Sequence, residues 1–133
     1  MKGTILYIED NPQNLYLLTF ILNAADYQVV QATSGEAGIT LANTRAPDLI
    51  LLDIQLPGMD GYAIARQLRS NPALQRIPIV AVTSYAMVGD REKALAAGCS
   101  GYLEKPINPE TFVAQIEVHL PPGRDAKPTV GMP

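Results

Sequence analysis

The stretch Asp48-Leu49-Ile50-Leu51-Leu52-Asp53 is the most hydrophobic run in the chain, and a carboxylate bounds it at each end. Four apolar residues in a row are typical of a strand that is buried on both faces of a parallel sheet. Three other polar groups follow apolar runs in the same way: Glu9-Asp10, Thr83-Ser84 and Lys105-Pro106. Ligands collect at the carboxyl edge of such a sheet, so this edge is the candidate active site.

Helix-length segments separate the apolar runs. We expect strands at residues 4–9 and 27–32, strands ending at 53 and near 82, and a short strand at 100–103. We expect helices at residues 12–25, 34–44, 61–70, 86–97 and 108–120, with Asn11, Ser34 and Asp60 as N-caps. This alternation predicts an α/β fold over residues 1–120, a doubly wound five-stranded parallel sheet in a three-layer sandwich. Residues 121–133 are rich in Pro and are predicted to form a disordered tail.

Composition narrows the class of protein. The apolar fraction of 47% and charged fraction of 17% suit an ordinary globular domain. A net charge of -3 without any Lys/Arg cluster argues against nucleic-acid binding. No apolar stretch approaches the ~20 residues of a membrane span, and because the first residues lead directly into a predicted strand we expect no signal peptide. The single cysteine, Cys99, cannot form an internal disulfide, so we expect a reducing, cytoplasmic location.

Residues 1–120 resemble the receiver (CheY-like) domain of two-component response regulators, a module with a flavodoxin-like (βα)5 sheet in the strand order 2-1-3-4-5. The resemblance is carried by three stretches, Glu-Asp-Asn-Pro at 9–12, Asp-Ile-Gln-Leu-Pro-Gly-Met-Asp-Gly at 53–61 and Gly-Tyr-Leu-Glu-Lys-Pro-Ile at 101–107. The polar groups after the first, third, fourth and fifth strands also follow the family's order and spacing. As a whole, the chain is similar to stand-alone single-domain regulators of the DivK type.

This resemblance implies that Asp53 accepts a phosphoryl group from a phosphohistidine of a partner histidine kinase or phosphotransfer protein. It implies a Mg²⁺ ion, replaceable by Mn²⁺, with Asp10, Asp53 and the main-chain carbonyl of Gln55 as ligands and Glu9 acting through water. Clustered carboxylates repel one another, so a hard divalent cation is their natural partner. The aspartyl-phosphate would later be hydrolysed in the same pocket, which makes the chain a slow self-phosphatase and not a conventional enzyme.

The resemblance assigns the phosphoryl oxygens to Lys105, the Thr83 hydroxyl and the Ser84 amide, and it implies a cis peptide between Lys105 and Pro106. Phosphoryl transfer relies on placement and charge neutralisation, which such donors supply. Thr83 and Tyr102 would form a coupled switch.

A downstream protein would bind the face of the fourth helix, fifth strand and final helix. The chain would be a monomer or a weak homodimer through this face. Val88-Gly89 lies near the start of the fourth helix, where an interior Gly costs about 1 kcal/mol relative to Ala and predicts a loosely held helix. Gln55 and Tyr85 occupy the positions that tune phosphoryl lifetime in this family, and we expect Tyr85 to shield the phosphoryl group from water.

Three alternative interpretations of the function stay open at this stage. The chain is also consistent with a receiver excised from a hybrid histidine kinase or a longer regulator. A haloacid dehalogenase-type phosphatase also uses an aspartyl-phosphate, but it places an acidic residue where this chain has Gln55. A flavin carrier fits the fold, but its phosphate-cradling loop would not be acidic. Each site residue also has an ordinary structural role when it is taken alone, and only the joint placement favours a site.

The other notable residues, which lie outside this edge, are predicted to have structural roles. Arg66 and Arg69 are predicted on a solvated helix face, and His119 on an exposed face of the final helix. Cys99 is predicted to be a small packed residue.

Overall fold

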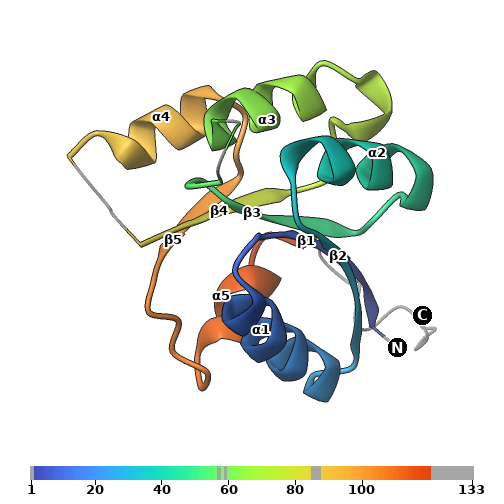
Figure 1. Ribbon diagram of the computed structural model, residues 1–133, viewed down its shortest axis with the longest axis vertical. Coiled ribbons are helices and arrows are strands. Elements are labelled where there is room, and N and C mark those ends of the chain that lie inside the picture. Colours follow the sequence, from blue (N-terminus) through green and yellow to red (C-terminus); the bar gives the residue numbers. More distant parts are fainter. Residues whose placement is uncertain (1, 57, 59, 85–87, 121–133) are drawn as a thin grey trace, which may run out of the picture.

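Each apolar run of the sequence forms one strand of a single parallel sheet. The computed structural model describes residues 2–56, 58, 60–84 and 88–120, and within these the strands lie in the order β2-β1-β3-β4-β5 (Figure 1). The strands are β1 (Gly3–Ile8), β2 (Tyr27–Ala32), β3 (Leu49–Asp53), β4 (Ile79–Thr83) and β5 (Gly101–Glu104). The register pairs Ile5 with Leu49 and Ile50 with Ile79. The predicted doubly wound, flavodoxin-like sheet is confirmed.

Several of the helices begin where the sequence supplies a capping side chain. They are α1 (Pro12–Ala24), α2 (Gly35–Arg45), α3 (Gly61–Arg69), α4 (Asp90–Ala96), α5 (Phe112–Glu117) and the 3₁₀ helix η1 (Pro72–Leu74). The Asn11 side chain accepts from the amides of Gln13 and Asn14, and Ser34 and Asp60 cap α2 and α3 in the same manner. These side chains satisfy amide groups that have no partner within the helix, which is why the helices start there.

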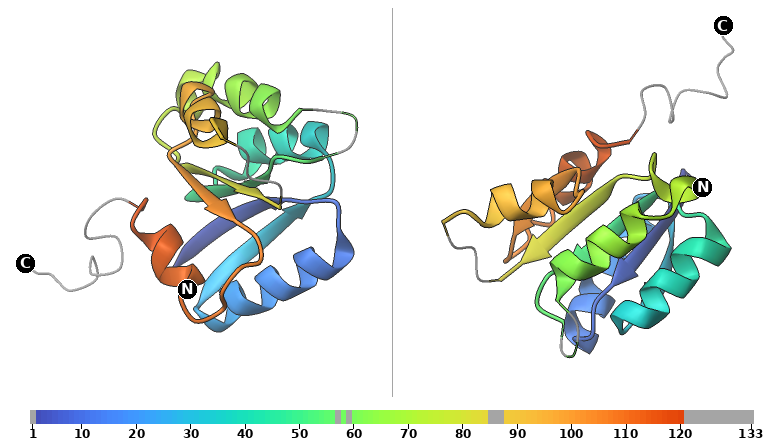
Figure 2. Two further views of the ribbon diagram at one scale, coloured as in Figure 1. Left: turned by 90° about the vertical axis from the view of Figure 1, so that its left-hand side faces the viewer. Right: turned by 90° about the horizontal axis from the view of Figure 1, so that it is seen from above.

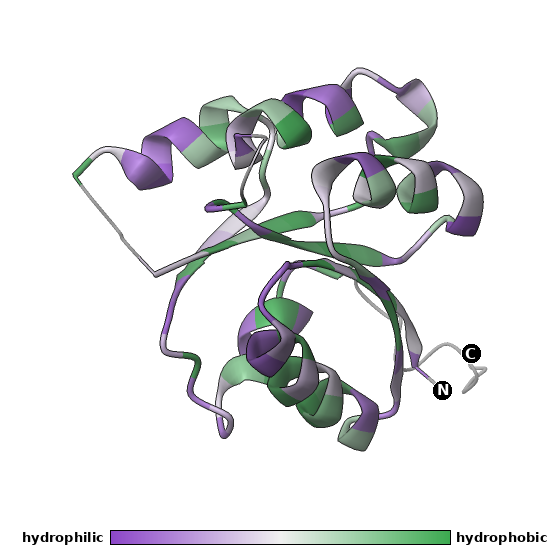
Figure 3. Cartoon of the chain, viewed as in Figure 1, coloured by the Kyte–Doolittle hydropathy of each residue, from purple (hydrophilic) through white to green (hydrophobic). Residues whose placement is uncertain are grey.

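The helices form two layers that cover opposite faces of the sheet. Figures 1 and 2 show α1 and α5 on one face and α2, α3 and α4 on the other. Alternate residues of β1 serve the two layers, since Ile5 and Tyr7 pack in the core with Phe112, whereas Leu6 and Ile8 pack with Ile64. The central strands β3 and β4 are hydrophobic along most of their length (Figure 3) and buried throughout, as expected for strands covered on both faces of the sheet.

Two helices are shorter than predicted. Helix α4 begins at Asp90, and Gly89 is its N-cap with a φ of 90°, so the prediction of an interior glycine in this helix is wrong. The final helix begins at Phe112 instead of residue 108, because Asn108 caps a preceding turn, accepting through its side chain from the amide of Glu110. The predicted tail at residues 121–133 and the predicted shield Tyr85 lie outside the described residues.

Two of the side chains assigned to solvated faces are in fact packed. Arg69 hydrogen-bonds the main-chain oxygens of Gly98, Leu74 and Ile77 at 2.7–2.8 Å. His119 is half-buried, and a Cβ added at Gly101 would overlap its ring. Burial and the neighbouring Arg91 lower the pKa of His119. Cys99 is buried, as predicted. Among the described residues, no helix combines the length and apolar character that crossing a bilayer requires.

The Arg69 contacts predict a large difference between two neighbouring arginines. Arg69→Met is expected to lower the free energy of unfolding by about 2–4 kcal/mol, because several carbonyl groups lose a charged donor. Arg66, which is exposed on the same helix, provides the control, and Arg66→Met is expected to change stability by less than about 0.5 kcal/mol. Urea unfolding of the three proteins measures both values. Equal stabilities of the two variants would contradict the role assigned to Arg69.

Candidate active site

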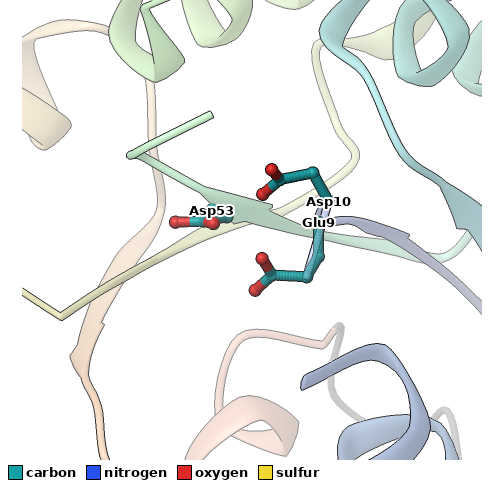
Figure 4. Close-up of side chains that lie close together, drawn as sticks. All are labelled: Glu9, Asp10 and Asp53. Carbon is teal, nitrogen blue, oxygen red and sulfur yellow. The ribbon is translucent and has the colours of Figure 1, made fainter. Parts of the chain in front are cut away.

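The polar residues that follow the strands meet at one edge of the sheet. Asp53 and Thr83 are the last residues of β3 and β4, and Glu9 and Asp10 follow β1 directly. Because β1, β3 and β4 are adjacent and parallel, their carboxyl ends lie side by side. Figure 4 shows the side chains of Glu9, Asp10 and Asp53 extending toward the same space beyond the strand ends.

The three acidic residues form a compact cluster. One carboxylate oxygen from each of Glu9, Asp10 and Asp53 lies within 4.8 Å of the others. Glu9 and Asp53 are 1% and 4% exposed, whereas Asp10 is exposed to solvent. Three oxygen donors at this spacing suit a hard divalent cation such as Mg²⁺.

Lys105 places a positive charge inside this cluster. Its ammonium nitrogen lies 2.8 Å from Glu9 Oε1 and 3.9 Å from Asp53 Oδ2. The Lys105 side chain is largely buried, and the Lys105–Pro106 peptide bond is cis. The loop after β5 therefore joins the edge formed by β1 and β3.

Glu9 is held by groups that the sequence analysis did not identify. The Tyr7 hydroxyl donates to Glu9 Oε1 at 3.1 Å, and the Asn14 side-chain amide donates to the same oxygen at 3.4 Å. The main-chain amide of Asn11 donates to Glu9 Oε2 at 3.2 Å. A sequence signal for Tyr7 existed, since residues two apart in a strand project from the same face. Asn14 carried no comparable signal beyond its place in the first turn of α1.

The two buried carboxylates have opposite tendencies to ionise. Burial and the adjacent Glu9 carboxyl raise the pKa of Asp53 to about 6, against the opposing influence of the Gln55 amide and Lys105. Burial also acts to raise the pKa of Glu9, but hydrogen bonds to Lys105, Asp53 and Asn11 outweigh it and leave that pKa below its ordinary value. Glu9 is therefore the charged partner of Lys105, and a further cation beside Asp53 would lower the raised pKa of that carboxyl.

Gln55 connects the predicted phosphoryl-binding groups. Its main-chain amide donates to Asp53 Oδ1 at 3.0 Å. Its side-chain oxygen accepts from the Ser84 amide at 3.0 Å, and its side-chain nitrogen donates to the Thr83 hydroxyl. The carboxamide thus lies across the two donors that the sequence analysis assigned to a phosphoryl group.

Tyr102 is a residue of β5 and lies away from the acidic cluster. Its hydroxyl is buried and has no hydrogen-bond partner among the described residues. The residue lines a hollow of about 450 Å³ between α4, β5 and α5, together with Gly89, Arg91, Glu92, Leu103, Glu104 and Gln115. The structure thus places Tyr102 in the predicted output face and not in contact with the acids.

Comparison with known proteins agrees with this fold. Residues 5–117 match the response regulator receiver domain, and the chain belongs to this family. It is a receiver domain of two-component systems, and its role is that of a phosphoacceptor.

The relatives include free-standing regulators and domains of larger proteins. The polar-differentiation response regulator DivK of Brucella ovis is 37% identical over 120 residues, which cover 90% of this chain and 98% of DivK. The receiver domain of a sensor histidine kinase from Pseudomonas aeruginosa, solved with a magnesium ion in its active site cleft, is 34% identical with a TM-score of 0.80, covering 87% of this chain and 95% of that one. The BeF3-activated receiver domain of Klebsiella pneumoniae RstA is 32% identical with a TM-score of 0.78, covering 87% and 97%.

The raised pKa of Asp53 predicts that Asp53→Asn stabilises the metal-free protein. We expect a gain of about 1–2 kcal/mol at pH 7.5 in EDTA, because the amide removes a charge that folding must desolvate beside Glu9. Folding raises this pKa from 3.8 to about 6. The ionised Asp53 carboxylate therefore destabilises the folded wild type fully above pH 6, and this destabilisation disappears as the pH falls toward 4. Urea unfolding at pH 7.5 and pH 4 measures the gain at both ends of this window.

Asp10→Asn is the matched control for this measurement. It removes an exposed carboxylate from the same cluster and is expected to stabilise the protein less. A gain for Asp53→Asn that persists unchanged at pH 4 would contradict the assignment.

Proposed function

We propose that Asp53 is the phosphoacceptor of this receiver domain and that its donor is a phosphohistidine on a histidine kinase or phosphotransfer protein. The observation that carries this proposal is the position of the Asp53 carboxylate. It lies at the end of β3, 3.9 Å from the Lys105 ammonium and clustered with the carboxylates of Glu9 and Asp10. A buried carboxylate among these charges is typical of a group that reacts with a phosphoryl group, and not of an ordinary surface residue.

The proposed transfer uses the polar groups at the carboxyl ends of β3, β4 and β5. An Asp53 oxygen attacks phosphorus while the bond from phosphorus to the donor imidazole nitrogen breaks, and that nitrogen retains the electron pair. Lys105 binds a phosphoryl oxygen, and the Thr83 hydroxyl and the Ser84 amide donate to the others. Hydrolysis in the same pocket later returns Asp53 to its free form. Because positioned charges supply most of the catalysis of phosphoryl transfer, no separate general base is needed.

The acidic cluster is proposed to hold Mg²⁺, for which Mn²⁺ can substitute. Asp10 and Asp53 would be direct ligands together with the main-chain carbonyl of Gln55, and Glu9 would act through water. The metal would neutralise charge on the incoming phosphoryl oxygens. The magnesium ion in the related Pseudomonas aeruginosa receiver supports this assignment, as do the three carboxylates within 4.8 Å of one another.

The proposed output surface is the face formed by α4, β5 and α5. Thr83 would move toward the phosphoryl group and Tyr102 would turn with it, changing the shape of the hollow that Tyr102 lines. A downstream protein would read this change, and the receiver itself would be a monomer or a weak homodimer. The net charge of -3 favours a protein partner over nucleic acid or an anionic membrane.

The dehalogenase-type phosphatase is disfavoured by the chemistry of residue 55. A glutamine carboxamide does not transfer protons near neutral pH, and the one found here is engaged with Thr83 and Ser84. Turnover at Asp53 is therefore expected to be slow. The same phosphoacceptor chemistry would serve a stand-alone regulator, a hybrid kinase or a longer regulator.

The proposal predicts a specific covalent modification. Incubation with Mg²⁺ and acetyl phosphate is expected to add one phosphoryl group to the wild type and none to Asp53→Asn, as measured by intact mass. Thr83→Ser keeps the hydroxyl and is expected to be phosphorylated, which controls for general damage to the site. Phosphorylation of Asp53→Asn at another residue would overturn the assignment of Asp53.

The metal assignment predicts a difference between two acidic residues. Asp10→Asn is expected to weaken Mg²⁺ binding by at least about tenfold, because one of the direct oxygen ligands loses its charge. The exposed residue Glu110 lies outside the cluster, and Glu110→Gln is expected to bind Mg²⁺ like the wild type. Tyrosine fluorescence measures binding, since Tyr7 contacts Glu9 and the chain has six Tyr and no Trp. Equal affinities for all three proteins would exclude Asp10 as a ligand.

A further inference from the structure

The Gln55 carboxamide contacts two adjacent groups at the end of β4. Its oxygen accepts from the Ser84 amide at 3.0 Å, and its nitrogen donates to the Thr83 hydroxyl. A main-chain amide can only donate, so the carboxamide has a defined orientation, with its oxygen toward Ser84. The two contacts therefore bridge residue 55 after β3 to residues 83 and 84 after β4.

These contacts coincide with the groups proposed to bind the phosphoryl oxygens. The Ser84 amide has a single hydrogen to donate, and in this structure it is directed at Gln55 Oε1. A phosphoryl oxygen on Asp53 would require that same hydrogen. The carboxamide and the phosphoryl group are therefore competitors for one position.

We propose that Gln55 is a latch on this site: its side chain occupies the phosphoryl-binding groups Thr83 and Ser84 before phosphorylation and must be displaced when Asp53 is modified. This proposal deepens the proposed function and rests on it. Gln55 is a positioning residue, since it acts on the reaction through Thr83 and Ser84 and not on phosphorus.

The surroundings of Gln55 allow this displacement. Its main-chain amide is tied to Asp53 Oδ1 at 3.0 Å, so the backbone stays in place. The side chain is exposed, and its carboxamide can exchange its two protein partners for water without becoming buried and unsatisfied. Release of the latch removes the Gln55 contact from Thr83, which is the residue whose movement would start the response at Tyr102. Gln55 thereby raises the threshold for both phosphoryl binding and the switch.

The test compares Gln55→Met with the wild type and with Gln67→Met. Methionine is similar in length to glutamine but offers Thr83 and Ser84 no comparable partner, and Gln67 is an exposed glutamine of α3. The dissociation constant of beryllofluoride is measured by fluorescence titration at saturating Mg²⁺, since this ligand activates the related RstA receiver. Gln55→Met is expected to bind it about two- to fivefold more tightly than the wild type, because the ligand no longer has to displace the Gln55 side chain. This factor corresponds to the free energy of one exposed hydrogen bond. Gln67→Met is expected to bind like the wild type, and Gln55→Ala repeats the test without a long side chain.

A second measurement needs no phosphoryl analogue. Amide hydrogen exchange at Ser84 is followed by NMR in the protein with Mg²⁺ alone, and Gln55→Met is expected to exchange at least about twofold faster than the wild type. A structural role for Gln55 elsewhere in the loop would not change this one amide together with the beryllofluoride affinity.

The outcomes separate this proposal from the function on which it rests. If the wild type binds beryllofluoride and both Gln55 variants bind it equally or more weakly, the latch is wrong and the phosphoacceptor assignment stands. Unchanged Ser84 exchange in Gln55→Met would also overturn the latch. If the wild type neither binds beryllofluoride nor gains a phosphoryl group from acetyl phosphate, the proposed function and the latch both fall.

Discussion

The ion pair between Lys105 and Glu9 is the interaction on which the site depends. Taking two carboxylates out of water at the ends of β1 and β3 carries a large desolvation penalty, and two negative charges side by side increase it. The Lys105 ammonium, at 2.8 Å from Glu9 and 3.9 Å from Asp53, offsets part of this penalty. It neutralises Glu9 but leaves Asp53 with a raised pKa, and the three carboxylates of the cluster outnumber its one lysine. That deficit is the physical reason for its proposed affinity for a divalent metal.

The same arrangement links chemistry at the edge of the sheet to a distant surface. Lys105 and Tyr102 lie close together in the chain, on or just after β5, yet one reaches the acidic cluster and the other lines the hollow between α4 and α5. Thr83, at the end of the adjacent strand β4, lies between these two regions. Its hydroxyl accepts a hydrogen bond from Gln55, which follows β3 on the other side of β4. In the proposed mechanism, a change at Asp53 would therefore reach the output face through two neighbouring strand ends and not through the core.

The errors of the sequence interpretation share a cause. Arg69 carries the signature of a solvated helix face, but three carbonyl groups from other segments turn toward its guanidinium. The sequence predicts Gly89 inside a helix because a helical pattern does not show which residue adopts a positive φ and therefore precedes the helix. His119 lies over Gly101 because that residue has no side chain to exclude the ring. In each case the deciding contact comes from a residue outside the helix or from a backbone angle, and periodicity encodes neither.

The sequence alone determined the strands, the doubly wound order of elements and the set of residues at the carboxyl edge, because hydrophobic runs and N-cap residues act locally and parallel strands end together. It also identified Glu9, Asp10, Asp53, Thr83 and Lys105 as members of one candidate site. Only the tertiary structure decided how charge is shared among them: which carboxyl pairs with Lys105, that Tyr7 supports Glu9, and that the Gln55 side chain reaches Thr83 and Ser84. Those outcomes depend on distances of a few ångströms and on burial, which arise only when strands far apart in the chain are packed side by side.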